Sequence, residues 1–176
     1  MELIIGCMFS GKSSELICRL KRHKAIGNQV LVINSTKDTR NSSNVLQTHD
    51  GVTFECVKTA DLLTLKTHPK FQTADIIGID ESQFFSHLEE FVRESLDLNK
   101  KVLVAGLDGD FQQKTFGEIL SLVPLAEKVD KLHALCMDCR DGTLASFTKR
   151  TVQSDDQELV GAGDLYKAVC RKHLLT

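Results

Sequence analysis

The eight residues 6–13 read GCMFSGKS and match the phosphate-loop pattern GxxxxGK[ST], which constrains the fold of this chain more than any other feature. The apolar run 3–5 before the loop predicts a buried strand, and apolar residues at 16, 17 and 20 after it predict a helix. Glycines let backbone N–H groups approach phosphate oxygens, a lysine adds positive charge, and a serine can ligate Mg²⁺. An ordinary strand-to-helix turn would account for the glycines but not for Gly-Lys-Ser. The pattern therefore predicts a nucleoside triphosphate site formed by Gly6, Cys7, Met8, Phe9, Ser10, Gly11, Lys12 and Ser13.

Length and composition narrow the class of protein. The 176 residues suffice for one domain with its own core and a small additional unit. A net charge of −2 and a pI near 6.3 argue against a dedicated binder of nucleic acid or of anionic membranes. No apolar run approaches the roughly 18 residues of a membrane helix, and no secretory signal is visible. We therefore expect a cytoplasmic protein without nucleic-acid or membrane partners.

Apolar runs alternate with helical patterns over the first three quarters of the chain. Residues 29–34, 74–80 and 101–107 predict buried strands, and residues 52–57 alternate as in a half-exposed strand. Between two of these strands, the apolar spacing over residues 87–98 predicts a helix. Continuous apolar strands separated by helices indicate a parallel α/β sheet that is covered on both faces.

Ligands of such sheets bind at the carboxyl ends of the strands. Asp80 ends a predicted strand, where phosphate-loop enzymes hold Mg²⁺ with a second acidic group; a helix N-cap is the alternative interpretation. Glu81 follows and could accept a proton from an attacking hydroxyl, or could be a solvated loop residue. Four segments should meet along this edge of the sheet, namely residues 6–13, 34–40, 80–85 and 107–111.

The character of the chain changes near His133, which suggests domains at residues 1–133 and 134–176. The second part contains two pairs of potential metal ligands, each pair with two residues between its members. Four cysteine or histidine ligands suit a closed, tetrahedral and structural zinc site. The alternative is that two such pairs occur by chance in a cysteine-rich chain. The predicted ligands are Cys136, Cys139, Cys170 and His173.

A glycine-containing segment, residues 161–166, lies between these two pairs and ends at Tyr166, the single tyrosine of the chain. Glycines would let the backbone approach a flat ligand. A flexible turn explains the same residues equally well.

The motifs together resemble the type II thymidine kinases, the cellular, bacterial and poxvirus-like class. The similarity covers essentially the whole chain in order. The shared elements are GCMFSGKS at 6–13, KDTR at 37–40, HDG at 49–51, IDESQFF at 79–85, AGLDGDF at 105–111, FG at 116–117, LVPLAE at 122–127, the CxxC pair at 136–139, TKR at 148–150 and the stretch 160–173.

The resemblance implies an α/β fold with a P-loop NTPase-type parallel sheet, flanking helices and a small C-terminal zinc-ribbon and lasso domain. It implies an enzyme that transfers the γ-phosphoryl group of ATP to the 5′-hydroxyl of thymidine, and of deoxyuridine, with ATP, Mg²⁺ and structural Zn²⁺ as cofactors. It also implies a homotetramer and inhibition by thymidine triphosphate.

Matching positions take the roles of the family. Glu81 matches the base that deprotonates the 5′-hydroxyl, and Ser13 with Asp80 would hold Mg²⁺. The nucleotide side comprises the phosphate loop with Asp38, Arg40, Asp80 and Gln83. The lasso, residues 140–169, would close over the base and recognise it largely through main-chain groups. The implied nucleoside contacts are Phe84, Leu107, Phe111, Gln157, Glu158, Leu159, Val160, Gly161 and Tyr166.

Some positions depart from the family pattern. Cys7 stands where proline is usual, Ser13 where threonine is frequent, and His173 where many members have cysteine; residues 161–163 read GAG where GGA is commoner. Two other classes remain open, a non-catalytic ATP-binding module that grips a protein or nucleic acid, and a phosphate-loop ATPase that uses water. The kinase is favoured because Glu81 and the aromatic residues are unnecessary for binding ATP alone.

Overall fold

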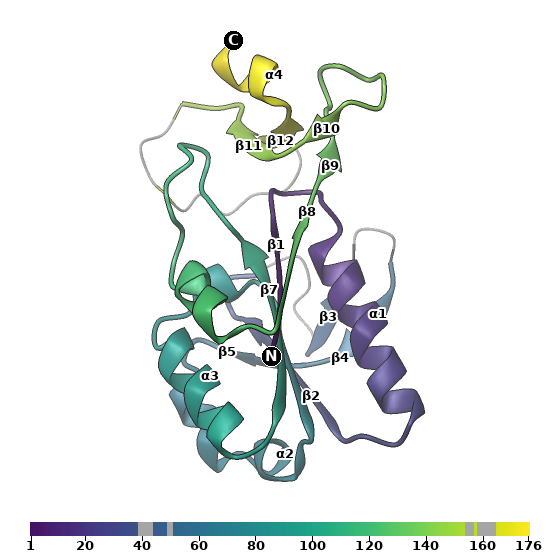
Figure 1. Cartoon of the computed structure of the whole chain (residues 1–176), viewed down its shortest axis with the longest axis vertical. Coiled ribbons are helices and arrows are strands. Elements are labelled where there is room, and N and C mark those ends of the chain that lie inside the picture. The colour runs from purple at the N-terminus through teal and green to yellow at the C-terminus, as the bar shows by residue number, and fades with distance from the viewer. Residues whose placement is uncertain (39–43, 49–50, 154–156, 158–164) are drawn as a thin grey trace.

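Six parallel strands form the central sheet of the computed structural model, in the order β5-β2-β6-β7-β1-β8 (Figure 1). The structure describes residues 1–38, 44–48, 51–153, 157 and 165–176. The order places β7 between β1, which leads into the phosphate loop, and β6, which leads into Asp80. The strands are β1 (Glu2–Gly6), β2 (Val30–Ser35), β5 (Val57–Thr59), β6 (Ile76–Ile79), β7 (Lys101–Leu107) and β8 (Lys128–Leu132).

Helices cover both faces of the sheet, as the continuous apolar strands predict. Helix α1 (Lys12–Ala25) packs on one face with Leu16 and Leu20, which contact Ile4 and Leu103 in one buried cluster. The other face is covered by α2 (Pro69–Thr73), α3 (Leu88–Asp97) and the 3₁₀ helices η1 (Leu63–Thr67) and η3 (Ile119–Leu125). A third 3₁₀ helix, η2 (Ser82–Phe84), follows β6 directly.

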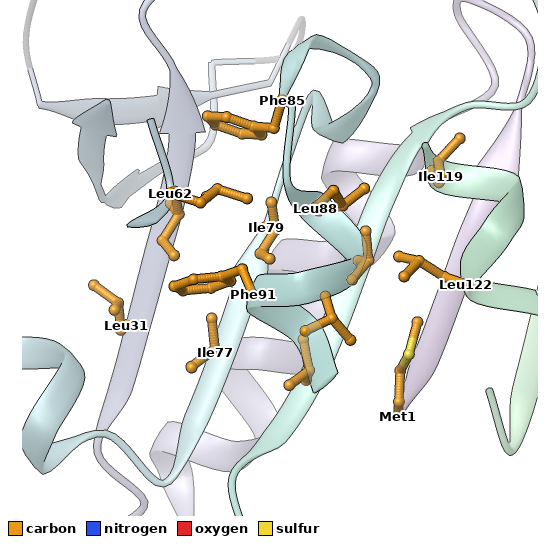
Figure 2. Packing of buried hydrophobic residues seen from close by; sticks show 14 of the residues in the cluster. Met1, Leu31, Leu62, Ile77, Ile79, Phe85, Leu88, Phe91, Ile119 and Leu122 are labelled. Atoms are coloured by element: carbon orange, nitrogen blue, oxygen red, sulfur yellow. The ribbon is translucent and has the colours of Figure 1, made fainter. Parts of the chain in front are cut away.

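The largest of the three hydrophobic cores in the described residues lies under α3 (Figure 2). Phe91 of α3 packs over Ile77 and Ile79 of β6, with Leu31 of β2 and Leu62 at the side. Neighbouring strand residues point to opposite faces, so Ile76 of the same strand belongs to the core under α1. A sheet buried on both sides is rigid, and it fixes where its carboxyl-end loops begin.

The segment 52–57, predicted as one strand, is divided at Cys56. Strand β4 (Thr53–Glu55) pairs antiparallel with β3 (Val45–Gln47), whereas β5 joins the edge of the central sheet parallel to β2. The break is stabilised because the backbone N–H of Cys56 donates to the carbonyl of Asn44 at 3.0 Å. The prediction of a single strand is therefore wrong at this point.

The C-terminal part lies beyond the carboxyl ends of the strands, at the top of Figure 1. Two short antiparallel ribbons and one helix turn form it, although its sequence has little periodicity. A small core of Ala134, Ala145, Ala168 and Val169 joins it to Cys7 of the phosphate loop. Its elements are β9 (Ala134–Leu135), β10 (Leu144–Ala145), β11 (Phe147–Arg150), β12 (Tyr166–Val169) and α4 (Arg171–Leu175).

These observations confirm the predicted fold class, a parallel sheet with flanking helices and a C-terminal unit that contains a cysteine and histidine cluster. Across the residues that the structure describes, no helix combines the length and apolarity needed to cross a membrane.

Candidate active site

The phosphate loop turns sharply out of the sheet at Gly6. Its φ of 148° is unfavourable for other residues, and a Cβ there would overlap the carbonyl oxygen of Leu132 on β8. Gly11, with φ of 82°, forms the N-cap of α1, and Lys12 begins that helix. The loop therefore ends at a helix N-terminus, which is a favourable position for an anion.

The Lys12 side chain folds back over the loop. Its Nζ donates to the backbone carbonyl of Cys7 at 2.6 Å. Burial lowers the pKa of Lys12, whereas the charges of Glu81, Asp80 and others nearby raise it in opposition. Because this ammonium group is buried, its electrostatic attraction to a bound phosphate would be stronger than in water.

Ser13 and Asp80 meet across the end of the sheet. The Ser13 Oγ donates to Asp80 Oδ2 at 2.7 Å, although 66 residues separate them in the chain. Asp80 directly follows β6 and is only 1% exposed, and its backbone N–H donates to the carbonyl of Ile33. Two adjacent oxygen groups at the foot of a phosphate loop are the hard ligands that Mg²⁺ takes together with nucleotide phosphates.

Glu81 leaves the strand in a left-handed conformation, with φ of 48° and ψ of 39°. The following 3₁₀ turn η2 returns Gln83 toward it, and Gln83 Nε2 donates to Glu81 Oε2 at 2.7 Å. Non-glycine residues with positive φ are uncommon and concentrate at functional sites. Glu81 is half-buried, so its carboxylate lies between the packed edge of the sheet and solvent.

Asp38, predicted on the nucleotide side, lies beyond the carboxyl end of β2. It is buried, with Asn34 Nδ2 donating to its Oδ2 at 2.9 Å, and Lys58 Nζ donates to its backbone carbonyl at 2.8 Å. Since β2 neighbours β6, Asp38 belongs to the same edge as Asp80. Arg40, predicted beside it, lies outside the described residues.

Arg150 connects several residues that the resemblance places around the nucleoside. Its guanidinium carbon lies 3.8 Å from the ring centre of Phe111 and 5.3 Å from that of Tyr166, and its Nη2 donates to the Tyr166 hydroxyl at 2.9 Å. The same nitrogen donates to the carbonyl of Gln157 at 3.2 Å. Sequence reasoning assigned Arg150 no individual role. Only the recurrence of Thr-Lys-Arg in the resemblance pointed to it.

Gln157 is also bound to the loop after β7, because its Nε2 donates to Asp110 Oδ2 at 2.8 Å. Asp110 itself is 8% exposed, and its other oxygen accepts from the backbone N–H groups of Gln112 and Lys114. This carboxylate thus orders the loop that carries Phe111. The other predicted lasso contacts, Glu158, Leu159, Val160 and Gly161, lie outside the described residues.

Phe84 and Leu107 are both half-buried at the ends of η2 and β7. The Phe84 ring meets Phe116 edge to face, with 5.6 Å between ring centres, and Lys37 Nζ lies 5.5 Å from the Phe84 ring centre. Leu107 is tied to Gln83 through its backbone N–H. The two residues therefore flank the turn that carries Glu81.

The C-terminal part holds the phosphate loop directly. The backbone N–H of Met8 donates to Thr148 Oγ1 at 3.0 Å, and the Cys7 thiol donates to the carbonyl of Ala145 at 3.3 Å. Burial raises the pKa of the Cys7 thiol, which keeps it protonated and able to donate. The cysteine at this position therefore packs the loop against the C-terminal part.

Three cysteines and one histidine converge in that part, and their ligand atoms all lie within 4.8 Å of one another. His173 Nδ1 is 3.5 Å from Cys136 Sγ, 3.3 Å from Cys139 Sγ and 3.5 Å from Cys170 Sγ, and the last two sulfurs are 3.8 Å apart. A tetrahedral zinc ion with bonds of about 2.3 Å to sulfur and about 2.0 Å to nitrogen separates its ligands by roughly 3.5–3.8 Å. The donor set and its spacing fit zinc.

Backbone N–H groups surround the Cys136 sulfur. Burial opposes ionisation of this thiol, but hydrogen bonds from the N–H groups of Cys170, Cys139 and Asp138 lower its pKa to about 6. Such donors stabilise a thiolate, which is the form that binds a metal.

Comparisons with known proteins agree over the whole chain. Residues 1–174 match the family model described as thymidine kinase. Thymidine kinase a of Arabidopsis thaliana is 42% identical over 180 residues, which cover 100% of this chain and 75% of that protein. The thymidine kinase of Myxoma virus (strain Uriarra) is 43% identical over 98% of this chain and 94% of its own length. The cytosolic thymidine kinase of Cricetulus griseus is 45% identical over 97% of this chain and 71% of its own length.

Proposed function

The chain belongs to the thymidine kinase family, and on that premise we propose that it transfers the γ-phosphoryl group of ATP to the 5′-hydroxyl of thymidine, and of deoxyuridine. The product is the nucleoside 5′-monophosphate. One observation carries the proposal beyond the family: Glu81 directly follows the Asp80 that pairs with Ser13, and its carboxylate lies near enough to Lys12 of the phosphate loop that its charge raises the pKa of Lys12 against the lowering caused by burial. A module that only binds ATP has no need for a carboxylate held at that place.

Phosphoryl transfer requires positioning and neutralisation of charge more than covalent assistance. Lys12 and the N–H groups of the loop would bind the triphosphate, since the loop ends at the start of α1. Ser13 and Asp80 would hold Mg²⁺, which supplies charge neutralisation at the phosphates when it is bound. The two residues fit that ion because their oxygens already lie 2.7 Å apart.

Glu81 would accept the proton of the 5′-hydroxyl as the oxygen attacks the γ-phosphorus. The bond that forms joins the sugar oxygen to phosphorus, and the bond that breaks releases ADP. Asp80, which is buried and bound to Ser13, is less suited to this task than Glu81, which faces partly outward.

The nucleoside would lie beyond Glu81, toward the C-terminal part. Support comes from Phe111 and Tyr166, which Arg150 brings together although Phe111 lies in the loop after β7 and Tyr166 begins β12. Phe84, Leu107 and Gln157 complete the described part of the wall that we propose. Cytosine would be disfavoured because its donor and acceptor pattern is reversed at the edge of the base, which leaves buried groups unpaired.

The cysteine and histidine cluster would hold a structural zinc ion, with residues 134–176 forming the smaller unit around it. All four ligands come from the protein, so the ion would have no open position for catalysis. Its contribution is to fold a segment whose own core is small. From the family alone we further propose cytoplasmic location, a homotetramer and inhibition by thymidine triphosphate.

The function is tested by incubating the protein with ATP, Mg²⁺ and a panel of nucleosides, and by measuring the monophosphate formed. Thymidine should have a kcat/KM well above that of deoxycytidine. Comparable values would contradict the proposed recognition of the base. Hydrolysis of ATP at a rate independent of nucleoside would instead identify an ATPase that uses water.

A further inference from the structure

We propose that Gln83 is a positioning residue that holds the Glu81 carboxylate where it accepts the hydroxyl proton. The inference rests on the proposed function, in which Glu81 is the base. It differs from the role that the family resemblance implies for Gln83, which is a contact on the nucleotide side.

The orientation of the Gln83 amide follows from its two partners. The backbone N–H of Leu107 can only donate, so the amide atom at 3.0 Å from it must be Oε1. The amide nitrogen therefore faces Glu81, and Nε2 donates to Oε2 at 2.7 Å. Leu107 at the end of β7 thus holds the amide oxygen of Gln83, and the amide nitrogen holds the Glu81 carboxylate.

The packing around Gln83 leaves little room for another arrangement. The residue is 3% exposed, and Ser82 beside it is fully buried. On β7, a Cβ at Gly106 would lie 2.8 Å from Gln83 Oε1 and would overlap Ser82 Oγ. Only glycine lets the strand approach this closely, so the amide is held by the sheet itself.

Such support is needed because Glu81 is only half-buried, on a turn that lies outside the strand. Its backbone has left the strand, and a glutamate side chain has several rotatable bonds that a general base must have ordered before the reaction. A hydrogen bond from the buried Gln83 amide restricts Glu81 to the rotamers whose carboxylate reaches that amide. Each end of that amide already has a partner within the protein, so a contact to ATP would have to use the second N–H of Nε2.

A double-mutant cycle separates this role from a structural or nucleotide-binding one. Gln83→Met keeps the volume and removes both hydrogen bonds. It is compared with the parent protein, and again in the background of Glu81→Gln, where the base is absent. The lost bond to Leu107 is common to both comparisons and cancels. The measured quantities are kcat, KM for ATP and KM for thymidine, with thermal unfolding as a check on folding.

We expect Gln83→Met to lower kcat by about tenfold or more in the parent protein, with KM for ATP within about twofold, and to change kcat by less than about twofold in the Glu81→Gln background. Equal losses in the two backgrounds, or a rise in KM for ATP as the main effect, would overturn the proposal. If Gln83→Met does not fold, Gln83→Asn keeps an amide that is one methylene too short to bridge Leu107 and Glu81, and the same cycle applies. A parent protein that does not phosphorylate thymidine, or a Glu81→Gln variant of normal rate, would instead refute the proposed function.

Discussion

The hydroxyl of Ser13 donates to the carboxylate of Asp80 at 2.7 Å, so the first turn of α1 is joined to the end of β6 across the intervening strand β7. This contact brings the two halves of the proposed magnesium site together. It also places them beside Glu81, the next residue in the chain.

Loss of the Ser13 hydroxyl should weaken Mg²⁺ binding. We expect Ser13→Ala to lower kcat/KM for MgATP by about tenfold or more, and extra Mg²⁺ should recover part of the loss. Ser13→Thr is the matched control, because it keeps the hydroxyl and should stay within about threefold of the parent. A normal Mg²⁺ dependence of Ser13→Ala would exclude this residue as a ligand.

Loss of the Arg150 guanidinium should affect the nucleoside and spare the nucleotide. Arg150→Met removes the stacking on Phe111 and the hydrogen bond to Tyr166. We expect KM for thymidine to rise by about tenfold, with KM for ATP unchanged within about twofold. Arg171→Met is the control, since its guanidinium stacks on Phe147 instead. Steady-state kinetics with each substrate varied would show equal changes in both KM values if the residue were only structural.

Zinc bound at the cysteine and histidine cluster, as proposed, should stabilise both the C-terminal part and the phosphate loop. Cys139→Ser should reduce the zinc content well below one ion per chain and lower Tm by about 5 °C or more. Because Thr148 and Ala145 hold the loop, the Kd for ATP should also rise. Cys18, which is exposed on α1, provides the control variant Cys18→Ser with unchanged zinc and Tm. Metal analysis that finds no zinc in the parent protein would refute the assignment.

Arg19 lies in the middle of α1 and is 8% exposed. It binds Glu2 and Glu15 at 2.8 Å each and Asp130 at 2.6 Å, joining the helix to β1 and β8. We expect Arg19→Met to lower the free energy of unfolding by about 2 kcal/mol, a value reduced for the partial exposure of the carboxylates. Arg93→Met is the control: Arg93 forms an exposed pair with Glu89, so the change should stay below about 0.5 kcal/mol.

The ion pairs of Arg19 also predict that the free energy of unfolding depends on pH. The hydrogen bond from Arg19 lowers the pKa of Asp130; burial raises that of Glu2, but hydrogen bonds from Lys101 and Arg19 lower it overall. A carboxylate with a lowered pKa stabilises the fold fully above its unfolded pKa of about 4 and loses this contribution as pH falls through the folded value. Chemical unfolding between pH 7 and pH 3 should therefore show a steeper acid loss for the parent than for Arg19→Met. Parallel curves would contradict this assignment.

The sequence predicted the parts of the fold that depend on continuous apolar strands. The strands around Ile4, Ile33, Ile77 and Val104 could be identified because their inner residues are all buried, on one face or the other. Strand β8 was missed, since an edge strand with the sequence KVDKL carries charges that resemble a loop. The division at Cys56 depends on pairing with distant segments, which local alternation does not encode.

In the candidate site, too, local motifs predicted some residues, whereas contacts formed on folding were not predicted. Motifs located Lys12, Asp80 and the cysteine and histidine cluster because their chemistry demands fixed residue types at fixed spacing. The bridge from Arg150 to Phe111 joins segments that meet only after folding, and the bond from Gln83 to Glu81 depends on the left-handed turn at Glu81 and on the distant Leu107, which holds the amide. No local pattern in the chain indicates which partner such a side chain will find.

The most direct test of the account is the kcat of Glu81→Gln with thymidine as the acceptor, alongside the Kd for ATP. We predict a loss of at least about 10²-fold in kcat with the Kd for ATP retained, because the amide keeps the size of the side chain but cannot accept the proton. A near-normal kcat would contradict the assignment of Glu81 as the base.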